Sequence, residues 1–574
     1  MTVLRPIGRR HATSRCTQET PRSSEAANGA RLALPSVVVR ATLIVLALCS
    51  TLLALSLAWR DRSEAITSPL LLAVAAIGPI ATDGRVVVYA RSSASGQELV
   101  VRSLSGDGER VVASVAGSID TVSVSAETIV WQERDCPSCP SRLRVRRLTE
   151  TTDLLVASAS DERSPVLWRR WLAWLSRDGH DRLYVADLSS EQPTATLASV
   201  ADEGTEFRTL RLHDGRLFWL EVSATGTWRL RTRPIAASSD PVTVLEGNAP
   251  APEFLVAGSE VVTVSDDAAL RIRPTSPRVV TLGTVAGAAL VATDGQYVFW
   301  LDPAPAGQDG AAIVAYDAAS GSRFVAVPAA EETKTLAASG GWLVWTRGEG
   351  ALQTLWAAPI SDLLPTAPRA APSEASSTWR YFPETGHYLA NGFRRFWERY
   401  GGTQLFGFPI SEEFDELDPT TGAFRTVQYF ERARFVWKPD NPGALEGVVL
   451  DRIGAELAER LDLPGTRPFR PVSSPQSTAC RYFAETGHAL CGGFLAAWLG
   501  TVDAFAPDLA VAADDLAVRL TGLPLSEPIA LPDGTIAQYC ERARLEYRRT
   551  SDQGGAVTRG RLGAELLQER GWLP

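Results

Sequence analysis

Four short sequence blocks occur twice in the C-terminal third of this chain, in the same order each time. They are RYFPETGH and RYFAETGH (380–387 and 481–488), LFGFPISE and LTGLPLSE (405–412 and 520–527), QYFERARF and QYCERARL (428–435 and 538–545), and RIGAEL and RLGAEL (452–457 and 561–566). Ordered self-similarity of this kind indicates a tandem duplication, and tandem modules usually bind rather than catalyse. The duplication therefore constrains both the architecture and the class of function.

Each copy is expected to fold as a small α+β module. In the first copy, apolar residues recur at helical spacing over 389–400, and residues 426–437 alternate as a strand. Segments rich in proline and serine on either side of the first copy are expected to be semi-extended linkers. The expected boundaries are 379–462 and 479–574 for the modules, and 363–378 and 463–478 for the linkers.

The section that precedes residue 362 repeats a short β-rich theme, in which a turn residue is followed by a run that ends in an aromatic residue. The theme occurs at 84–89, 127–131, 171–174, 215–219, 295–300 and 341–345, and more weakly at 258–263. A period of about 43 residues, with several short strands in each period, is typical of a β-propeller with one blade per repeat. We therefore predict a mainly β fold with a seven-bladed β-propeller over 66–362.

A second β-like run follows each theme, and in several units it alternates arginine with apolar residues, as in RLRVR at 142–146. This alternation suits strands that show one face to water. The units resemble the WD40-like repeats of the TolB type, a resemblance that implies the fold and says little about function. The aromatic residues of the theme are expected to pack between neighbouring blades. Residues 69–74 match the last strand of other units, so we expect them to complete the seventh blade and close the ring.

The N-terminal segment predicts export. Residues 41–59 contain no charge and are long enough, as a helix, to cross a hydrocarbon core of about 30 Å. Seven arginines precede this stretch, in an arginine-rich tail (1–40) without a foldable core. Positive charge stays cytoplasmic, so the bulk of the chain is expected outside the cell membrane, behind a single span. A cleaved signal peptide is the alternative, and it also exports the body of the chain.

The duplicated modules resemble the LGFP repeat of bacterial exported proteins. That family's LG-[FY]-P-x-S-[DE] core corresponds to LFGFPISE at 405–412, where Phe406 is inserted, and its T-G-x-H corresponds to TGH at 385–387, which lacks the spacer residue. The second copy departs further from the pattern. The resemblance implies contact with the cell wall or with a surface glycan.

Charged residues of the repeated blocks are the candidate ligand contacts. They are Glu384, His387, Glu431, Arg432 and Arg434 in the first copy, and Glu485, His488, Glu541, Arg542 and Arg544 in the second. The alternative for each histidine is a structural bond to a backbone carbonyl or to the glutamate of the Tyr-Phe-Glu-Arg block. The arginines could form a surface ion-pair ladder or a bidentate site for an acidic glycan. No HExxH, G-x-S-x-G or Cys/His metal cluster is present in the sequence, so we assign no catalytic residue, metal ligand or cofactor.

The cysteine pattern agrees with an oxidising compartment. Cys136 and Cys139 flank a Pro-Ser pair, and a disulfide that clamps this loop is expected. Cys480 and Cys491 bracket the second ETGH block, and the first copy has no cysteine at either matching position. We expect these two to be bonded, with Cys540 unpaired.

These observations favour a membrane-anchored extracytoplasmic binding protein or scaffold. The propeller would contact a protein or ligand, and the repeats would contact cell-wall glycan or another envelope protein. The net charge of −9 argues against nucleic acid as a partner. An extracytoplasmic hydrolase or lyase that uses the propeller funnel is the alternative. It would need acids and histidines clustered at equivalent blade edges, whereas His180 and His213 stand alone in the sequence.

Overall fold

A computed structural model describes residues 69–574 except 107, 159, 237–238, 249, 265–268, 274–278, 287–289, 306–309, 504–512 and 550–554. The expected tail (1–40) and transmembrane helix (41–59) lie outside the described residues. Within the described part, no helix is both long enough and apolar enough to span a bilayer. Ile66–Pro574 form one compact unit.

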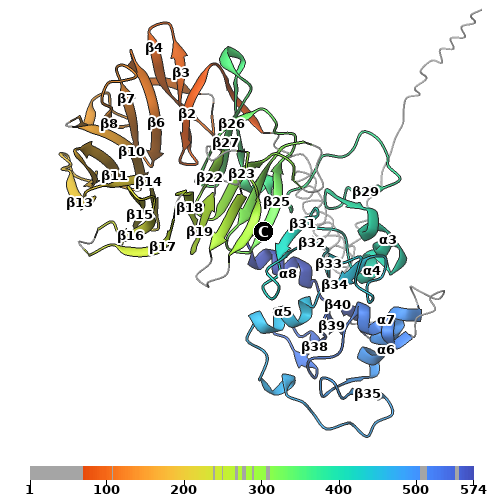
Figure 1. Ribbon diagram of the computed structural model, residues 1–574. Coiled ribbons are helices and arrows are strands. Elements are labelled where there is room, and N and C mark those ends of the chain that lie inside the picture. Colours follow the sequence, from red (N-terminus) through yellow and green to blue (C-terminus); the bar gives the residue numbers. More distant parts are fainter. Residues whose placement is uncertain are drawn as a thin grey trace, which may run out of the picture. The chain divides into compact units, whose positions relative to one another are not determined.

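The first part of this unit is a β-propeller of four-stranded antiparallel sheets (Figure 1). In chain order the first four sheets are β2 (Ile77–Thr82) to β5 (Glu109–Val115) with β3 (Val86–Ser93) and β4 (Gly96–Ser103); β6 (Ser118–Ser125), β7 (Thr128–Arg134), β8 (Arg142–Arg147) and β9 (Asp153–Ala157); β10 (Asp161–Trp168), β11 (Trp171–Asp178), β12 (His180–Asp187) and β13 (Thr196–Val200); and β14 (Thr205–His213), β15 (Arg216–Ser223), β16 (Trp228–Pro234) and β17 (Val242–Gly247). The next sheets are β18 (Glu253–Ala257), β19 (Glu260–Val264), β20 (Ala269–Arg273) and β21 (Val280–Thr284); β22 (Val291–Thr293), β23 (Tyr297–Asp302), β24 (Ala312–Asp317) and β25 (Ser322–Val327); and β26 (Thr333–Ser339), β27 (Trp342–Arg347), β28 (Thr354–Pro359) and β1 (Leu70–Val74).

The ring of blades is closed by the N-terminal strand, as predicted. The first strand of each sheet contacts the first strand of the next, from β2 through β6, β10, β14, β18, β22 and β26 and back to β2. Strand β1 pairs antiparallel with β28, with Leu70 opposite Ala357, and so supplies the fourth strand of the last blade. The prediction for residues 69–74 is confirmed.

In six blades the aromatic residue of the sequence theme lies on the second strand and is buried, whereas β19 of the fifth blade has no aromatic residue. Trp131, Trp219 and Trp300 have no exposed surface. Trp131 packs against Val88 and Ala90 of the preceding blade, so it fills the interface between blades as expected. Its indole nitrogen donates to Glu133 over 2.7 Å, which satisfies the one polar atom that burial removes from water.

The outermost strand of each blade carries a β-bulge at the same place. Arginines of the next blade donate hydrogen bonds to carbonyls that these bulges free. The pairing skips Leu72, Val112, Leu154, Ala198, Val244, Leu282 and Ala326. Four of the freed carbonyls accept a hydrogen bond from an arginine, at the pairs Arg102–Leu72, Arg146–Val112, Arg233–Ala198 and Arg323–Leu282. Bulges of this kind disrupt an edge that would otherwise pair with other chains. Some arginines of the sequence alternation are therefore ties between blades.

Two copies of one α+β module follow the propeller. The first comprises β29 (Trp379–Phe382), β30 (His387–Ala390), α3 (Asn391–Arg399), α4 (Gly402–Leu405), β31 (Phe414–Leu417), β32 (Phe424–Tyr429), β33 (Arg434–Trp437), β34 (Val448–Leu450) and α5 (Ile453–Arg460). The second comprises β35 (Cys480–Phe483), β36 (His488–Cys491), α6 (Gly492–Asp503), α7 (Ala513–Leu520), β37 (Ile529–Ala530), β38 (Ile536–Tyr539), β39 (Arg544–Tyr547), β40 (Val557–Arg559) and α8 (Leu562–Glu569). The prediction of a single strand over 426–437 is wrong. It is a hairpin, because the chain turns at 430–433, where Phe430 N donates to Ala433 O over 2.8 Å.

The two expected linkers are parts of the modules. After the short helix α2 (Ile360–Leu363), Pro365 O accepts a hydrogen bond from Glu412 N over 2.8 Å. Pro468 O, within the 3₁₀ turn η2 (Arg467–Phe469), accepts one from Glu527 N at the same distance. Both segments read Pro-x-x-Pro at corresponding positions. The repeat therefore begins near 365 and 468, earlier than the boundaries at 379 and 479 that the sequence blocks indicated.

The modules share one core and are fused to the propeller. A single buried cluster contains Phe396 and Phe435 of the first copy together with Trp498 and Leu545 of the second. Strand β31 pairs with β25, the outer strand of a propeller blade, which produces an eight-stranded sheet. Trp572, near the end of the chain, packs on Phe324 of the propeller and on Phe414 of the first module. The candidate residues of the first module are therefore held in a fixed position relative to the propeller.

Candidate functional site

The two histidines of the repeated ETGH blocks are buried structural residues. His387 is 3% exposed, and its Nδ1 lies 3.1 Å from Glu412 Oε1, which also accepts from Tyr388 N. His488 and Glu527 repeat this contact over 3.2 Å. Both histidines therefore bond a glutamate, but it is the last residue of the LFGFPISE block rather than the glutamate of the Tyr-Phe-Glu-Arg block.

Glu384 and Glu485 do not join the histidines. Each lies on the exposed turn between the two strands of its ETGH hairpin. Each module instead ties its hairpin to the rest of its fold through a buried glutamine. Gln428 Nε2 donates to Tyr388 O over 2.7 Å and to Ser411 O over 2.9 Å, and Gln538 makes the matching pair of bonds in the second copy. The repeated motif letters thus encode the module's internal framework.

Glu431 and Glu541 link the two modules to each other. Each accepts from a backbone N–H of its own Gly-Pro turn, Phe408 N at 3.2 Å and Leu523 N at 3.1 Å. Each then pairs with an arginine of the other copy: Glu431 with Arg561 at 3.0 Å and Glu541 with Arg452 at 3.0 Å. The exchange is reciprocal, so the two copies form an internal pseudo-twofold pair.

The exchange extends to the main chain. Gly454 N of α5 donates to Glu541 O over 3.1 Å, and Ala564 N of α8 donates to Glu431 O over 3.2 Å. A Cβ on Gly454 would lie 2.1 Å from Cys540 O, and one on Gly563 would lie 2.0 Å from Phe430 O. The glycine of each RxGAEL block is therefore required for the other copy's turn to approach the helix.

Arg432 is also used internally, and Arg542 is half-buried. Arg432 Nη1 donates to the carbonyls of Thr403 and Gln404 at 2.9 and 3.0 Å, which satisfies the end of α4. Burial lowers the pKa of Arg542 below its usual value, with Glu541 acting in the opposite direction. The bonds of Arg432 to the end of α4 leave it without the open bidentate geometry that an acidic glycan would need.

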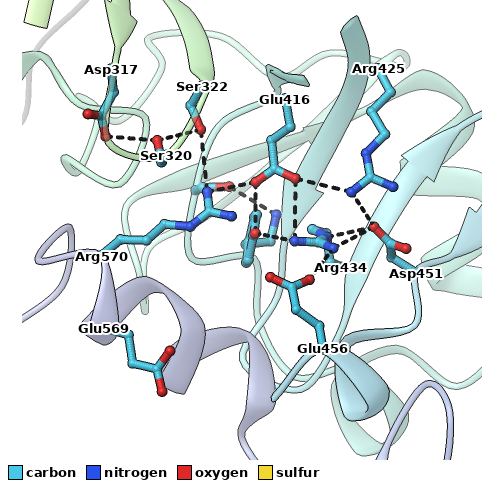
Figure 2. Close-up of polar contacts among 12 residues, drawn as sticks. Asp317, Ser320, Ser322, Glu416, Arg425, Arg434, Asp451, Glu456, Glu569 and Arg570 are labelled. Carbon is cyan, nitrogen blue, oxygen red and sulfur yellow. Dashed lines mark hydrogen bonds and ion pairs between the residues drawn. The ribbon is translucent and has the colours of Figure 1, made fainter. Parts of the chain in front are cut away.

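Arg434 lies at the centre of the most extensive buried ion-pair cluster in the described residues, shown in Figure 2. It contacts Glu416 at 3.3 Å, Asp451 at 2.6 Å and Glu456 at 2.6 Å. Arg570, from the turn after α8, reaches Glu416 at 2.6 Å and the propeller's Ser322 at 3.4 Å. One cluster therefore joins the propeller, the first module and the C-terminal end of the chain.

The charges in this cluster are balanced, which explains why they are tolerated in the interior. Burial raises the pKa of Glu416, but Arg434 and Arg570 outweigh that effect and the net pKa lies below the ordinary carboxyl value. Asp451 has a lowered pKa for the same reason, with burial opposed by Arg434 and Arg425. All three acids are ion-paired with the arginines of the cluster. We therefore interpret the cluster as a structural lock, that is, a set of ion pairs that stabilises the joint.

The second copy keeps the central arginine and changes its partners. Arg544 contacts Glu565 at 2.7 Å, as Arg434 contacts Glu456, but its second acid is Glu546 at 2.6 Å. Glycine 560 stands where the first copy has Asp451, and a Cβ there would lie 2.5 Å from Glu546 Oε1. The second acid of the cluster therefore lies on the neighbouring strand in the second copy, and the glycine at 560 leaves room for it.

The cysteines lie as the sequence indicated. Cys136 is bonded to Cys139 in the β7–β8 loop, and Cys480 is bonded to Cys491 across the β35–β36 hairpin, where the two residues face each other in register. Cys540 is buried and free, and burial raises its pKa to about 12. A thiol in that state is neither a nucleophile nor a metal ligand.

The propeller has open hollows, but its described residues form no catalytic constellation. One, of about 730 Å³, lies at the rim near β11 and β14, and it contains His180, Arg177 and Glu206. Arg177 is already paired with Asp181 at 2.7 Å and with Glu206 at 3.2 Å. His213 lies apart, with Nε2 3.0 Å from Gly258 O. No group of three potential metal ligands occurs among the residues that the structure describes.

Several residues that hold the modules together were not predicted from the sequence. Glu412, Glu527 and the two Pro-x-x-Pro segments were overlooked, although their recurrence in both copies was a usable signal. Trp437 was also overlooked, and no repeat signal pointed to it because the second copy has Tyr547 there.

Comparisons with known proteins add little to this geometry. Neither a protein-family model nor a curated protein matches the chain. Among solved structures, the β-propeller domain of Myceliophteria thermophila Cps50 (Swd1) has a TM-score of 0.37 and 11% identity, covering 50% of this chain and 99% of that domain. The propeller domain of the Trilobed protease from Pyrococcus furiosus has a TM-score of 0.36 and 11% identity, covering 51% and 97%. BamB from Moraxella catarrhalis has a TM-score of 0.32 and 15% identity, covering 49% and 85%. Likeness at this level concerns the β-propeller fold alone.

Proposed function

We propose that this protein is a membrane-anchored extracytoplasmic scaffold. The segment 41–59 anchors it, a seven-bladed propeller offers a rigid surface for a protein or ligand, and the C-terminal pair of LGFP-like modules contacts the cell wall or a surface glycan. The observation that carries the proposal is the fused joint between propeller and modules. Strand β31 extends the sheet of β25, and Arg323 pairs with Asp415 across it at 2.5 Å.

Rigidity of this kind suits a scaffold, because it holds two surfaces at a fixed separation without needing to move. The buried charged groups at the joint are paired with one another, as Glu416 is with Arg434 and Arg570. The two disulfides support an oxidising compartment, where such bonds form and persist. No observation on the described residues favours the alternative of a hydrolase or lyase in the propeller funnel.

The test is binding of residues 66–574, the compact unit, to purified cell-wall sacculi. The protein is produced with its disulfides formed and is sedimented with and without sacculi. Soluble oligosaccharide released from the same sacculi serves as competitor. We expect co-sedimentation that saturates and that the competitor reduces. Equal amounts of pelleted protein with and without sacculi would refute wall contact. The anchor is tested separately, by membrane fractionation of the full chain against the form that lacks residues 1–65.

A further inference from the structure

Trp437, at the end of β33, is the one exposed aromatic side chain among the described residues. It is 39% exposed, whereas every described phenylalanine, tyrosine and other tryptophan is buried or half-buried. Its indole nitrogen makes no hydrogen bond to any described residue. Exposing a tryptophan leaves a large apolar ring in contact with water. The side chain therefore presents an apolar ring and an unbonded N–H donor together at the surface.

The Trp437 ring packs against the backbone of two glycines, where a side chain would collide with it. A Cβ on Gly392, at the start of α3, would lie 2.1 Å from Trp437 Cζ3, and one on Gly447 would lie 2.7 Å from both Cζ3 and Cη2. Gly447 also has a φ of +80°, which favours glycine. Phe393 meets the ring edge-on, with centroids 6.2 Å apart. An exposed ring that is packed along one edge loses little conformational entropy when a ligand contacts it.

The surroundings of the ring are polar and carry both signs of charge. Along α3, Arg395 and Arg399 follow Gly392 at helical spacing, and both reach Glu446, at 3.7 and 3.2 Å. Glu446 directly precedes Gly447, so this ion-pair group borders the ring. Lys438 follows Trp437 and is exposed. A lone aromatic ring beside exposed donors and acceptors differs from a protein-docking patch, whose centre is apolar and depleted of charge.

We infer that Trp437 is a stacking platform for a pyranose ring of a cell-wall glycan. A pyranose presents a face of C–H groups, which suits the negative face of an indole, and a rim of hydroxyls that need donors and acceptors. The free indole N–H and the Arg395–Glu446–Arg399 group supply both. The local excess of positive charge is too small for a nucleic-acid footprint. This inference rests on the proposed function and names where in the modules the glycan is held.

The second copy does not repeat the platform. Tyr547 occupies the corresponding position, and it is half-buried. Its hydroxyl accepts from Gly555 N over 3.4 Å, and a Cβ on Gly555 would lie 2.5 Å from the ring. The tyrosine is therefore covered by its own loop. One site is expected for the pair of modules, and Tyr547 provides a matched control.

The experiment compares Trp437→Ala with Tyr547→Ala in residues 66–574, using purified sacculi and the oligosaccharides that muramidase releases from them. We expect the dissociation constant to rise about tenfold or more for W437A and less than twofold for Y547A. Thermal unfolding and the disulfide state of both variants are measured in parallel. Unchanged binding by folded W437A would overturn the inference while leaving wall contact intact. Absence of binding by the unsubstituted protein would overturn the proposed function, and the inference with it.

A second measurement needs no variant. N-bromosuccinimide at low molar ratio oxidises exposed tryptophan first, so mass spectrometry should find Trp437 modified before the buried tryptophans. Saturating oligosaccharide should slow this oxidation severalfold. Protection elsewhere, or equal oxidation of Trp437 with and without oligosaccharide, would overturn the inference even if W437A failed to fold.

Discussion

Removing the charge of Glu416 is expected to destabilise the joint between propeller and modules more than any exposed charge nearby. The side chains of Glu416, Arg434 and Arg570 are 5%, 4% and 8% exposed, so solvent screens their interactions little. Glu416→Gln keeps the shape and the bond to the Tyr429 hydroxyl, which is 2.8 Å long, but leaves two buried arginines short of an acid. Breaking a buried pair in this way costs about 3–5 kcal/mol.

The matched control is Glu569→Gln. Glu569 is in the same region of Figure 2, but it is 37% exposed and its contact with Arg460 is 3.4 Å long. Exposed pairs contribute about 0–1 kcal/mol. Chemical denaturation of residues 66–574, followed by tryptophan fluorescence, should therefore show a large loss for E416Q and almost none for E569Q. Equal losses for the two variants would refute the assignment of the cluster as a structural lock.

The pH dependence gives the same prediction an independent check. The folded pKa values of Glu416 and Asp451 are lowered, so their contribution is fully present above the ordinary carboxyl pKa of about 4 and is lost as the pH falls toward the folded values. A protonated Glu416 resembles glutamine. The stability difference between E416Q and the unsubstituted protein should be constant from pH 6 to pH 7 and should shrink below about pH 4. A difference that does not change with pH would show that the substitution acts through packing instead.

Two further predictions concern the second module. Gly560→Asp should destabilise it by about 1–3 kcal/mol, because the new side chain collides with Glu546, and adding Glu546→Val should restore stability by recreating the arrangement of the first copy; a double variant no more stable than G560D alone would contradict this. Non-reducing mass spectrometry should find Cys480 linked to Cys491, with Cys540 free and resistant to alkylation until the protein is denatured, whereas a Cys491–Cys540 link would show that the pairing is wrong.

The propeller could be predicted from the sequence because its signal is local and repeated. Six of the seven blades carry a turn, a buried strand and an aromatic residue that fills an interface, and these fall within a few residues of one another in each of those periods. The closing strand β1 could be placed because a closed ring leaves no alternative for an unpaired strand beside a three-stranded blade. The β-bulges could not be predicted, since the skipped residues differ in type, from Ala198 to Leu282, and only the pairing register reveals them.

The roles of the candidate residues were harder to predict than the propeller. A residue that recurs in both copies can belong either to the internal framework of the module or to a ligand site. His387 recurs as His488 and is buried against a glutamate that lies far along the chain. The partner was within another repeated block, but nothing in the spacing indicates which blocks meet. The reciprocal contacts of Glu431 and Glu541 were equally hidden, since they depend on the two copies packing face to face.

Comparison of the two copies separates the residues that hold the module from those that are free to change. The glutamine, histidine and serine of the framework are the same in both copies, and the displaced acid at Glu546 preserves the charge that Arg544 requires. By contrast, the exposed Trp437 of the first copy corresponds to Tyr547 in the second, whose ring is covered by its own loop. This difference between the copies is what the inference of a glycan platform at Trp437 predicts, with one site for the pair of modules.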